Sequence, residues 1–380
     1  MTEKLYYKDA YIKEFEATVL SCEKEKDLYK IVLDKTAFFP EGGGQTSDVG
    51  KISDAVVTDV QEQDDIIYHY ANKEVQGVVS CTLDFEKRFD KMQNHSGEHL
   101  VSGLSHKLFG TENVGFHLAD DVVTLDTNIP LTGEQIVQLE LEANKAIYAN
   151  VEIKCFFPSA EELETLVYRS KLDLKENVRI VDITGIDACA CCAPHVKQTG
   201  EIGIIKVIDS MNWKGGTRLT ILCGERALSH YKKTYETVKA ISNLFSAKQD
   251  TLFEFVSKYA EETEKLKNEL AGADIERAKL IASLTPETDQ SIVIKDDCLK
   301  NDGMRELVNL LKDKTEKCVC VLSGVDGAYR YILGAKEMPL RTLIKDLNQK
   351  LNGKGGGNDQ MVQGTFNAPF NEIETEIKNL

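Results

Sequence analysis

Hydrophobic and polar residues alternate along about the first seventy residues, with the period of two that half-buried β-strands show. The alternation is clearest at residues 17–22, 28–34 and 66–70, and clusters of charged, glycine and proline residues separate these runs. Such clusters are typical of turns between strands. The pattern predicts a small, barrel-like β domain over residues 1–85.

A helical period replaces this alternation after residue 85. Residues 88–108 place Met92, Leu100, Leu104 and Leu108 on one face of a predicted helix. A second helix is predicted over residues 134–150, where Thr132 and Gln135 have the spacing of a capping box. Further strands are predicted at residues 151–157, 178–181, 202–207 and 219–224. We therefore expect an α+β domain over residues 86–225.

Apolar residues recur near heptad a and d positions between residues 226 and 283, where glycine and proline are almost absent. This pattern predicts a helical, coiled-coil-like arm over residues 226–285, as an antiparallel or a dimeric hairpin. After Pro286 the pattern predicts a small α/β domain over residues 286–380. Its expected strands are 291–294, 318–322 and 329–333, and its expected helices are 305–311, 341–351 and 371–378. The fold class is therefore α+β throughout.

Composition fits a folded protein and argues against a membrane protein. Hydrophobic residues make up 42% of the chain and charged residues 28%, and no apolar run reaches membrane-spanning length. The first residues lack the apolar core of a signal peptide, so we expect a cytoplasmic location. Ten cysteines in that setting favour reduced thiols and metal ligation. The formal charge of −16 opposes binding of phosphate backbones except at a local basic surface.

Two short segments carry candidate metal ligands. His95 and His99 are four residues apart on a predicted helix, so they share one face. Cys191 and His195 have the same separation in a later segment. Together these residues offer the four nitrogen and sulfur ligands that a tetrahedral zinc site needs. The spacing leaves open whether Cys189 or Cys192 takes the place of Cys191, and buried cysteines can also be ordinary core residues.

Two glycine-rich segments stand out beside these ligands. Residues 36–45 read TAFFPEGGGQ, and residues 352–358 read NGKGGGN. Consecutive glycines allow backbone to approach a ligand closely, and glycines beside a lysine can hold a phosphate through backbone N–H groups. A flexible turn explains the first segment equally well, and a cap for the preceding helix explains the second.

Four ordered motifs make the chain resemble the free-standing alanyl-tRNA editing proteins of the long AlaX type: the glycine-rich motif at 36–45, the two ligand pairs and the final glycine-rich segment. The last domain resembles the DHH-associated domain at the end of alanyl-tRNA synthetases. The resemblance covers nearly the whole chain. It implies hydrolysis of the ester in alanine tRNA that carries serine, with glycine as a second candidate, because a pocket built for a methyl group discriminates poorly between such small side chains.

The resemblance also implies roles for single residues. One Zn²⁺ per chain is expected to bind His95, His99, Cys191 and His195. Thr36 is the candidate for sensing the seryl hydroxyl, and Gln45 for contacting the terminal adenosine or the ester. The expected substrate and tRNA contacts are Gly42, Gly43, Gly44, Arg88, Lys354, Gly355 and Gly356. A homodimer formed by the helical arm, the last domain or both is expected.

Three other functions compete with this interpretation. His95-Ser96-Gly97-Glu98-His99 also has the His-x-x-Glu-His pattern of inverzincin metallopeptidases, in which Glu98 would activate water. A non-catalytic tRNA-binding or dimerisation protein with a structural zinc would also use four protein ligands. A phosphoesterase is a third alternative, but the chain has no Asp-His-His tripeptide. The sequence leaves open whether zinc is catalytic or orienting.

Overall fold

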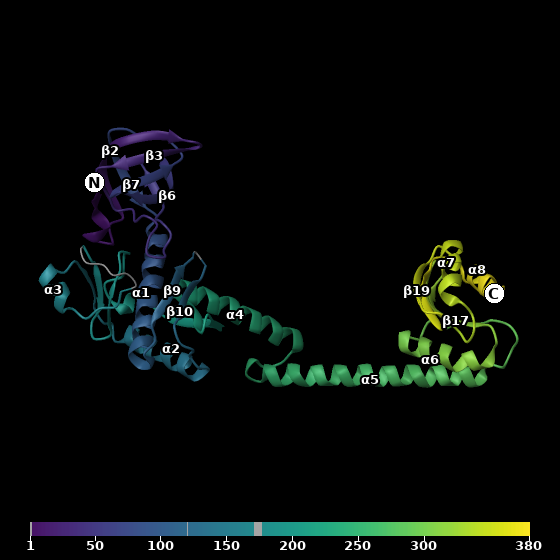
Figure 1. Cartoon of the computed structure of the whole chain (residues 1–380). Helices are drawn as coiled ribbons and strands as arrows, with labels where there is room; N and C mark the ends of the chain where they lie inside the picture. Colours follow the sequence, from purple (N-terminus) through teal and green to yellow (C-terminus); the bar gives the residue numbers. More distant parts are fainter. Residues whose placement is uncertain (1, 120, 171–176) are drawn as a thin grey trace. The chain divides into compact units, whose positions relative to one another are not determined.

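The computed structural model describes residues 2–119, 121–170 and 177–380. Contacts within the chain divide it into two compact units, Met1–Ala240 and Ile241–Leu380. Both units combine helices and sheets, so the expectation of an α+β chain is confirmed (Figure 1). None of the helices in the described part has the length and apolarity needed to span a bilayer.

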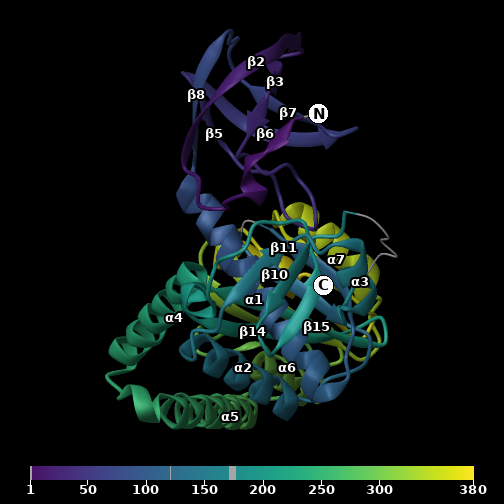
Figure 2. The same ribbon diagram turned by 90° about the vertical axis from the view of Figure 1, so that its left-hand side faces the viewer.

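The N-terminal strands close into a barrel in the order β2-β3-β7-β6-β5-β8 (Figures 1 and 2). Its strands are β2 (Glu14–Glu25), β3 (Leu28–Leu33), β5 (Gly50–Ile52), β6 (Ala55–Gln63), β7 (Ile66–Ala71) and β8 (Val78–Leu83). Alternate residues fill the interior, as β8 shows with every second side chain buried. Two short strands, β1 (Glu3–Lys4) and β4 (Lys35–Thr36), form a separate parallel pair. The 3₁₀ turn η1 (Leu5–Tyr7) follows β1.

Helix α1 (Phe85–Phe109) leads from the barrel into the centre of the next domain (Figure 1). Asp84 caps its first turn by accepting a hydrogen bond from the Lys87 N–H, and Gly110 ends it with a left-handed backbone (φ 67°). Two glycines let other segments approach the helix closely. A Cβ on Gly97 would lie 2.3 Å from Cys223 Sγ, and one on Gly103 would lie 2.4 Å from the Asp187 Cβ.

Two sheets surround α1. The four-stranded sheet has the order β14-β15-β10-β9, and the three-stranded sheet the order β11-β12-β13. Their strands are β9 (Asn113–Leu118), β10 (Val123–Thr127), β11 (Ile153–Phe156), β12 (Ile180–Ile183), β13 (Asp187–Ala190), β14 (Ile205–Trp213) and β15 (Gly216–Cys223). The helical elements are α2 (Gly133–Tyr148), α3 (Ala160–Thr165) and the 3₁₀ turn η2 (Thr199–Ile202). The predicted capping box of Thr132 and Gln135 is present at the start of α2.

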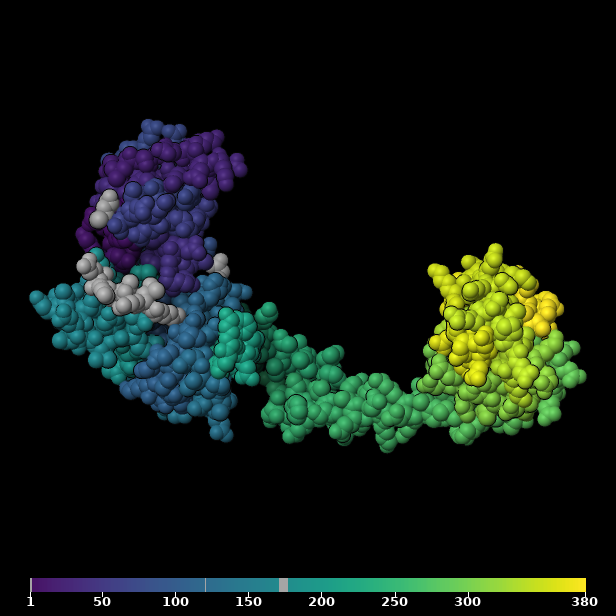
Figure 3. Space-filling view, in the orientation of Figure 1, coloured from purple at the N-terminus to yellow at the C-terminus, as the bar shows by residue number. Residues whose placement is uncertain are grey.

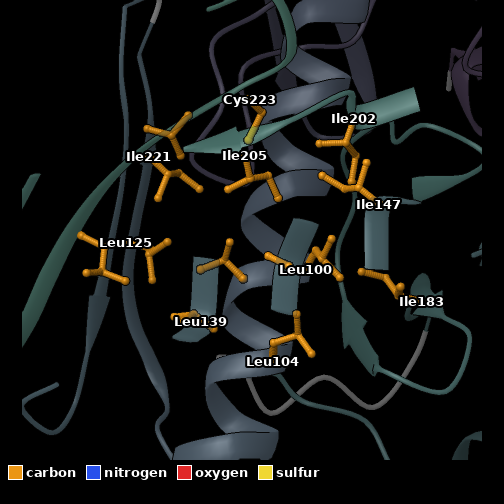
Figure 4. Close-up of a cluster of buried hydrophobic side chains, with 14 of the residues drawn as sticks. Leu100, Leu104, Leu125, Leu139, Ile147, Ile183, Ile202, Ile205, Ile221 and Cys223 are labelled. Carbon is orange, nitrogen blue, oxygen red and sulfur yellow. The ribbon is translucent and has the colours of Figure 1, made fainter. Parts of the chain in front are cut away.

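Side chains from α1, α2 and both sheets meet in one hydrophobic core (Figure 4). This cluster includes Leu100 and Leu104 of α1, Leu139 of α2, Leu125 of β10 and Ile183 of β12. The barrel packs directly on this domain, as the space-filling view shows (Figure 3). The core therefore fixes α1 and the segment after β13, which carry the candidate metal ligands.

The region predicted as an arm is helical. Helix α4 (Gly224–Phe245) is followed by the 3₁₀ turn η3 (Gln249–Thr251) and by α5 (Leu252–Leu284). The end of α5 belongs to the core of the C-terminal unit, because Ala278 and Ala282 pack there beside Leu307 of α6 (Asn301–Leu311). Helix α5 ends at Leu284, and the boundary expected at residue 286 stays a prediction. A hairpin of α4 and α5 stays a prediction.

The C-terminal unit is built on a five-stranded sheet in the order β16-β17-β18-β20-β19. Its elements are β16 (Ile292–Lys295), α6 (Asn301–Leu311), the 3₁₀ turn η4 (Lys312–Lys314), β17 (Cys318–Val325), β18 (Ala328–Ala335), α7 (Leu340–Lys350), β19 (Lys354–Gly357), β20 (Met361–Phe366) and α8 (Phe370–Lys378). Strands β16 and β17 are parallel, and the other neighbours are antiparallel.

The final glycine-rich segment is a strand over residues 354–357, and its first two residues cap the preceding helix, as one explanation expected. Asn352 has a left-handed backbone (φ 48°), and the Gly353 N–H donates to the Asn348 carbonyl near the end of α7. Lys354, Gly355 and Gly356 lie in β19, an exposed strand at the edge of the sheet. The glycines are explained by close packing: a Cβ on Gly355 would lie 2.3 Å from Tyr331 Oη, and one on Gly353 would lie 2.7 Å from the Phe366 ring. The pattern was misleading because consecutive glycines are rare in strands.

Candidate functional site

The four predicted ligands form one cluster, in which the three histidines are buried and Cys191 is partly buried. His95 and His99 project from α1, and Cys191 and His195 follow β13. Their four ligand atoms lie within 4.8 Å of one another. Cys191 Sγ is 3.6 Å from His95 Nε2 and 3.4 Å from His195 Nε2. Of the three cysteines in this segment, Cys191 is the one in the cluster.

These distances fit a bound metal ion. A tetrahedral ion about 2.3 Å from sulfur and about 2.0–2.1 Å from nitrogen holds those two ligand atoms about 3.5 Å apart. Three imidazoles and one thiolate are also ligands that zinc prefers over hard cations such as Mg²⁺. The donor set and its spacing therefore suit one ion of the zinc type.

Neighbouring side chains orient two of the imidazoles. His95 Nδ1 lies 2.9 Å from Gln45 Oε1, and His195 Nδ1 lies 3.0 Å from Ser96 Oγ. Each Nδ1–H donates to its oxygen when Nε2 faces the cluster. Ser96 is itself fixed, because its Oγ also accepts from the Val196 N–H. Gln45 and Ser96 therefore select the ring tautomers that a metal requires.

The ionisation of the cluster also depends on a cation. Burial, with smaller contributions from His99 and His95, holds the pKa of His195 well below its ordinary value, so this ring is neutral and has a lone pair to donate. Burial raises the pKa of the Cys191 thiol. A thiolate at this depth consequently needs a positive ion beside it.

The glycine-rich segment after β4 lies against this cluster. The Gly44 carbonyl accepts a hydrogen bond of 2.9 Å from the Leu118 N–H. Gly43 and Gly44 have left-handed backbone (φ 61° and 81°), and a Cβ on Gly44 would lie 2.8 Å from the Phe116 ring. The Phe116 ring in turn contacts His95, with 4.7 Å between ring centroids. Only glycine fits at residue 44 without displacing this ring.

A cavity of about 520 Å³ opens beside the cluster. This volume is in the range of small-molecule sites. The described residues that line it are Tyr7, Gly43, Gly44, His95, Glu98, His99, Ser102, Glu112, Asn113, Phe116, Phe157, Arg169, Ser170, Asn177, Arg179 and Cys189–Cys192.

The lining combines polar and aromatic side chains. Glu98 and Ser102 of α1 and Asn113 of β9 supply a carboxylate, a hydroxyl and an amide to the lining. Arg169, which also lines the cavity, is ion-paired with Asp187. Elsewhere in the lining the Tyr7 and Phe157 rings meet edge to face, with centroids 5.3 Å apart, and the Arg179 guanidinium lies 5.3 Å from the centre of the Tyr7 ring. The cavity is therefore suited to a ligand with both a polar head and an aromatic base.

Neither Thr36 nor Gln45 is among the described residues that line this cavity. Thr36 is fully buried, and its Oγ1 lies 2.8 Å from His69 Nε2 and accepts from the Phe38 N–H. Gln45 is 1% exposed and contacts His95. Its Nε2 has no hydrogen-bond partner among the described residues.

Arg88 also lies apart from the cavity lining. Its buried guanidinium is ion-paired with Asp48 and donates to the carbonyls of Ala10 and Ala37. Asp48 also accepts from the Phe39 N–H. Arg88 therefore ties the glycine-rich segment to α1, and a contact with tRNA stays a prediction. Lys354, Gly355 and Gly356 belong to the C-terminal unit.

Several residues of the site have no signal in the sequence. Ser96, Asn113, Arg169 and Arg179 are ordinary polar residues in the chain, and their roles come from long-range contacts. Arg179, for example, donates to the carbonyls of Cys191 and Ala193 and so fixes the ligand segment. A pattern search that joined residues distant in sequence would be needed to find them.

The fold and the site define the chain as a closed barrel joined to an α+β domain with a buried His–Cys cluster that can hold a metal ion. Residues 178–220 match the family described as threonyl and alanyl tRNA synthetase second additional domain, and residues 2–92 match tRNA synthetases class II (A). Over 98% of its length, the chain is 30% identical to the alanyl-tRNA editing protein AlaX-L of Pyrococcus horikoshii, of which it covers 96%. It therefore belongs to the family of alanyl-tRNA editing proteins.

Other relatives extend this comparison. The alanyl-tRNA editing protein Aarsd1 of Danio rerio is 28% identical over 97% of this chain and 95% of its own length. An alanine–tRNA ligase of Ignicoccus hospitalis is 27% identical over 94% of this chain and 40% of its own length. The solved C-Ala domain of Aquifex aeolicus alanyl-tRNA synthetase matches 24% of this chain over 86% of its own length, at 22% identity and with a TM-score of 0.21.

Proposed function

We propose that this chain is a trans-editing hydrolase that cleaves the ester of mischarged alanine tRNA, chiefly Ser-tRNA(Ala) and secondly Gly-tRNA(Ala). The observation that carries the proposal is the buried His–Cys cluster at the cavity, in a chain that aligns with an alanyl-tRNA editing protein over nearly its whole length. The volume of the cavity suits an aminoacyl group and part of the terminal adenosine.

The metal in this proposal is one Zn²⁺ held by His95, His99, Cys191 and His195. When bound, zinc can polarise the ester carbonyl, lower the pKa of a water or orient the aminoacyl group. Gln45 and Ser96 hold the His95 and His195 rings for that ion. The N–H groups of Gly43 and Gly44 are our candidates for contacting the ester or the ribose, because both residues line the cavity, whereas the Gly42 N–H donates to the Gln45 carbonyl.

The terminal adenosine has a candidate platform in Tyr7, Phe157 and Arg179. Aromatic rings and a guanidinium plane are common partners for unpaired bases. These three side chains line the same cavity as His95, His99 and Cys191. This placement supports an orientation in which the base lies on the rings and the ester reaches the cluster.

One observation favours a second function. Four protein ligands fill a tetrahedral shell, as in structural zinc sites. Under that alternative the chain would bind tRNA or form dimers without hydrolysing the ester. A cavity that opens beside the ligands has no purpose in that case, so we prefer the hydrolase.

The two functions are separated by deacylation of Ser-tRNA(Ala) with the wild type and with Cys191→Ala, and zinc content is measured in parallel. The hydrolase proposal predicts that Cys191→Ala lowers both zinc content and rate. Cys298→Ala, which changes an exposed cysteine of the C-terminal unit, should keep both and serves as the matched control. A wild-type rate equal to that of buffer would contradict the proposal.

A further inference from the structure

The substrate of the proposed reaction carries a charge that the metal site does not explain. An aminoacyl ester has an α-ammonium group on the carbon next to its carbonyl, and this group needs hydrogen-bond acceptors when water is displaced. A metal cation and the Arg179 guanidinium make the surroundings unfavourable for a second cation, whereas Arg169 is already paired with Asp187. A carboxylate close to the ligands is therefore required.

Two carboxylates are among the described residues that line the cavity, Glu98 and Glu112. Glu98 is 3% exposed and lies on α1 three residues after His95, so the two side chains are neighbours on one face of the helix. Glu112 has a half-exposed side chain, and its Oε1 lies 3.1 Å from His106 Nδ1. Burial makes Glu98 the stronger partner for a cation, because solvent screens it less.

The Glu98 carboxylate is held in place from β9. Asn113 Nδ2 donates to Glu98 Oε1, and Asn113 Oδ1 accepts a 3.1 Å hydrogen bond from the Gly115 N–H. The second bond fixes the orientation of the Asn113 amide, so its NH₂ group points to the carboxylate. A carboxylate accepts from several donors at once, so this support is compatible with a bound ammonium.

We propose that Glu98, oriented by Asn113, is the binding site for the α-ammonium group of the aminoacyl ester. The inference rests on the proposed function and deepens it. It assigns a role to a residue between two metal ligands that zinc ligation alone does not use. The chemical consequence is selection for a free amine, since acylation of the nitrogen removes its charge and adds bulk. Esters of N-acylated amino acids, such as those of peptidyl-tRNA, are then poor substrates.

The test compares Ser-tRNA(Ala) with N-acetyl-Ser-tRNA(Ala) for the wild type and for Glu98→Gln. A charge-assisted hydrogen bond accounts for about 10- to 100-fold in binding. We expect the wild type to favour the free amine by about that factor in kcat/KM. Glu98→Gln should lose this factor on the free amine, mainly through a higher KM, and its ratio between the two substrates should approach one. The inference is overturned if the ratio of kcat/KM between the free-amine and the N-acetyl substrate is the same in Glu98→Gln as in the wild type.

Two control variants show where the effect arises. Glu86→Gln removes an exposed carboxylate from the first turn of the same helix and should leave rate and ratio unchanged. Glu112→Gln changes the other carboxylate of the lining. If Glu112→Gln, instead of Glu98→Gln, abolishes the preference, the inference is also overturned. Zinc content and thermal unfolding of each variant identify any loss caused by damage to the fold.

A binding measurement keeps the inference independent of turnover. Calorimetry with 3′-seryl-amino-3′-deoxyadenosine, a non-hydrolysable amide, and with its N-acetyl form measures the amine preference directly. A preference that Glu98→Gln abolishes supports the inference even if the wild type fails to hydrolyse Ser-tRNA(Ala), in which case only the proposed function falls. Equal binding of both forms by the wild type contradicts the ammonium site and leaves the hydrolase proposal to its own test.

Discussion

Single residues at the cluster show how far spacing alone can predict a site. The separations of His95 from His99 and of Cys191 from His195 predict a four-ligand cluster, and the structure brings these side chains together. The residues that orient them could not be predicted in the same way. Ser96 meets His195 across 99 positions of sequence, and a lone serine has no periodic or motif signal that marks such a contact.

Gln45 is a residue where a substrate contact and a supporting role can be distinguished. Gln45→Leu should lower the affinity for zinc by about 10- to 100-fold, because His95 loses the acceptor for its Nδ1–H. Competition with a chromophoric chelator measures this affinity. Gln76→Leu, at an exposed position of the barrel domain, is the control. Unchanged zinc affinity in Gln45→Leu would remove it from the support of the metal.

Thr36 is our candidate for sensing the seryl hydroxyl. Thr36→Val should narrow the difference between the rates on Ser-tRNA(Ala) and Ala-tRNA(Ala). It should also lower the free energy of unfolding by about 1–3 kcal/mol, because Nε2 of buried His69 loses its partner. Parallel deacylation and urea unfolding measure the two effects. A loss of stability with an unchanged ratio would assign Thr36 to the barrel alone.

At the scale of elements, His69 makes the stability of the barrel depend on pH. Burial lowers its pKa to about 4 from 6.5, so the folded barrel keeps a neutral ring that the unfolded chain protonates more readily. The contribution of the neutral His69 ring to the free energy of unfolding is complete above pH 6.5. It is lost as the pH falls towards 4, and the loss amounts to roughly 3 kcal/mol. Urea midpoints across this range should fall less in His69→Gln than in the wild type, and equal slopes would contradict this assignment.

Substitutions in the edge strand β19 test whether close packing requires its glycines. Gly355→Ala places a Cβ 2.3 Å from Tyr331 Oη and 2.4 Å from the Gln363 carbonyl, so it should destabilise the fold by about 1–3 kcal/mol. Gly356→Ala meets nothing within 4 Å and should have little effect. Thermal unfolding compares the two neighbours. Equal melting temperatures of the two variants would contradict the explanation that close packing requires glycine at residue 355.

Elements with a clear period could be predicted from the sequence, and those without one could not. The helix expected at 88–108 is α1, and the strands expected at 28–34 and 318–322 are β3 and β17. Strand β19 was missed because its four residues are one lysine and three glycines, which have no alternation of polar and apolar side chains. Its place is set by packing on Tyr331, a contact that local pattern does not encode.

At the scale of the whole molecule, dimerisation through the helical region stays a prediction. Helix α5 exposes Phe253, Leu266, Leu270 and Leu280, of which Leu266 and Leu270 share a face. We expect Leu266→Glu with Leu270→Glu to convert a dimer to a monomer in sedimentation. Lys265→Glu with Lys267→Glu, which changes exposed charges on the same helix, is the control. A monomeric wild type would contradict the prediction.

The central claim is that this chain selects mischarged alanine tRNA for hydrolysis. The most direct measurement is the ratio of initial deacylation rates on Ser-tRNA(Ala) and Ala-tRNA(Ala) by the zinc-loaded wild type. We predict rapid loss of serine and a rate on the alanyl ester that is lower by at least about tenfold. Equal rates on the two esters, or no release of serine above buffer, would contradict it.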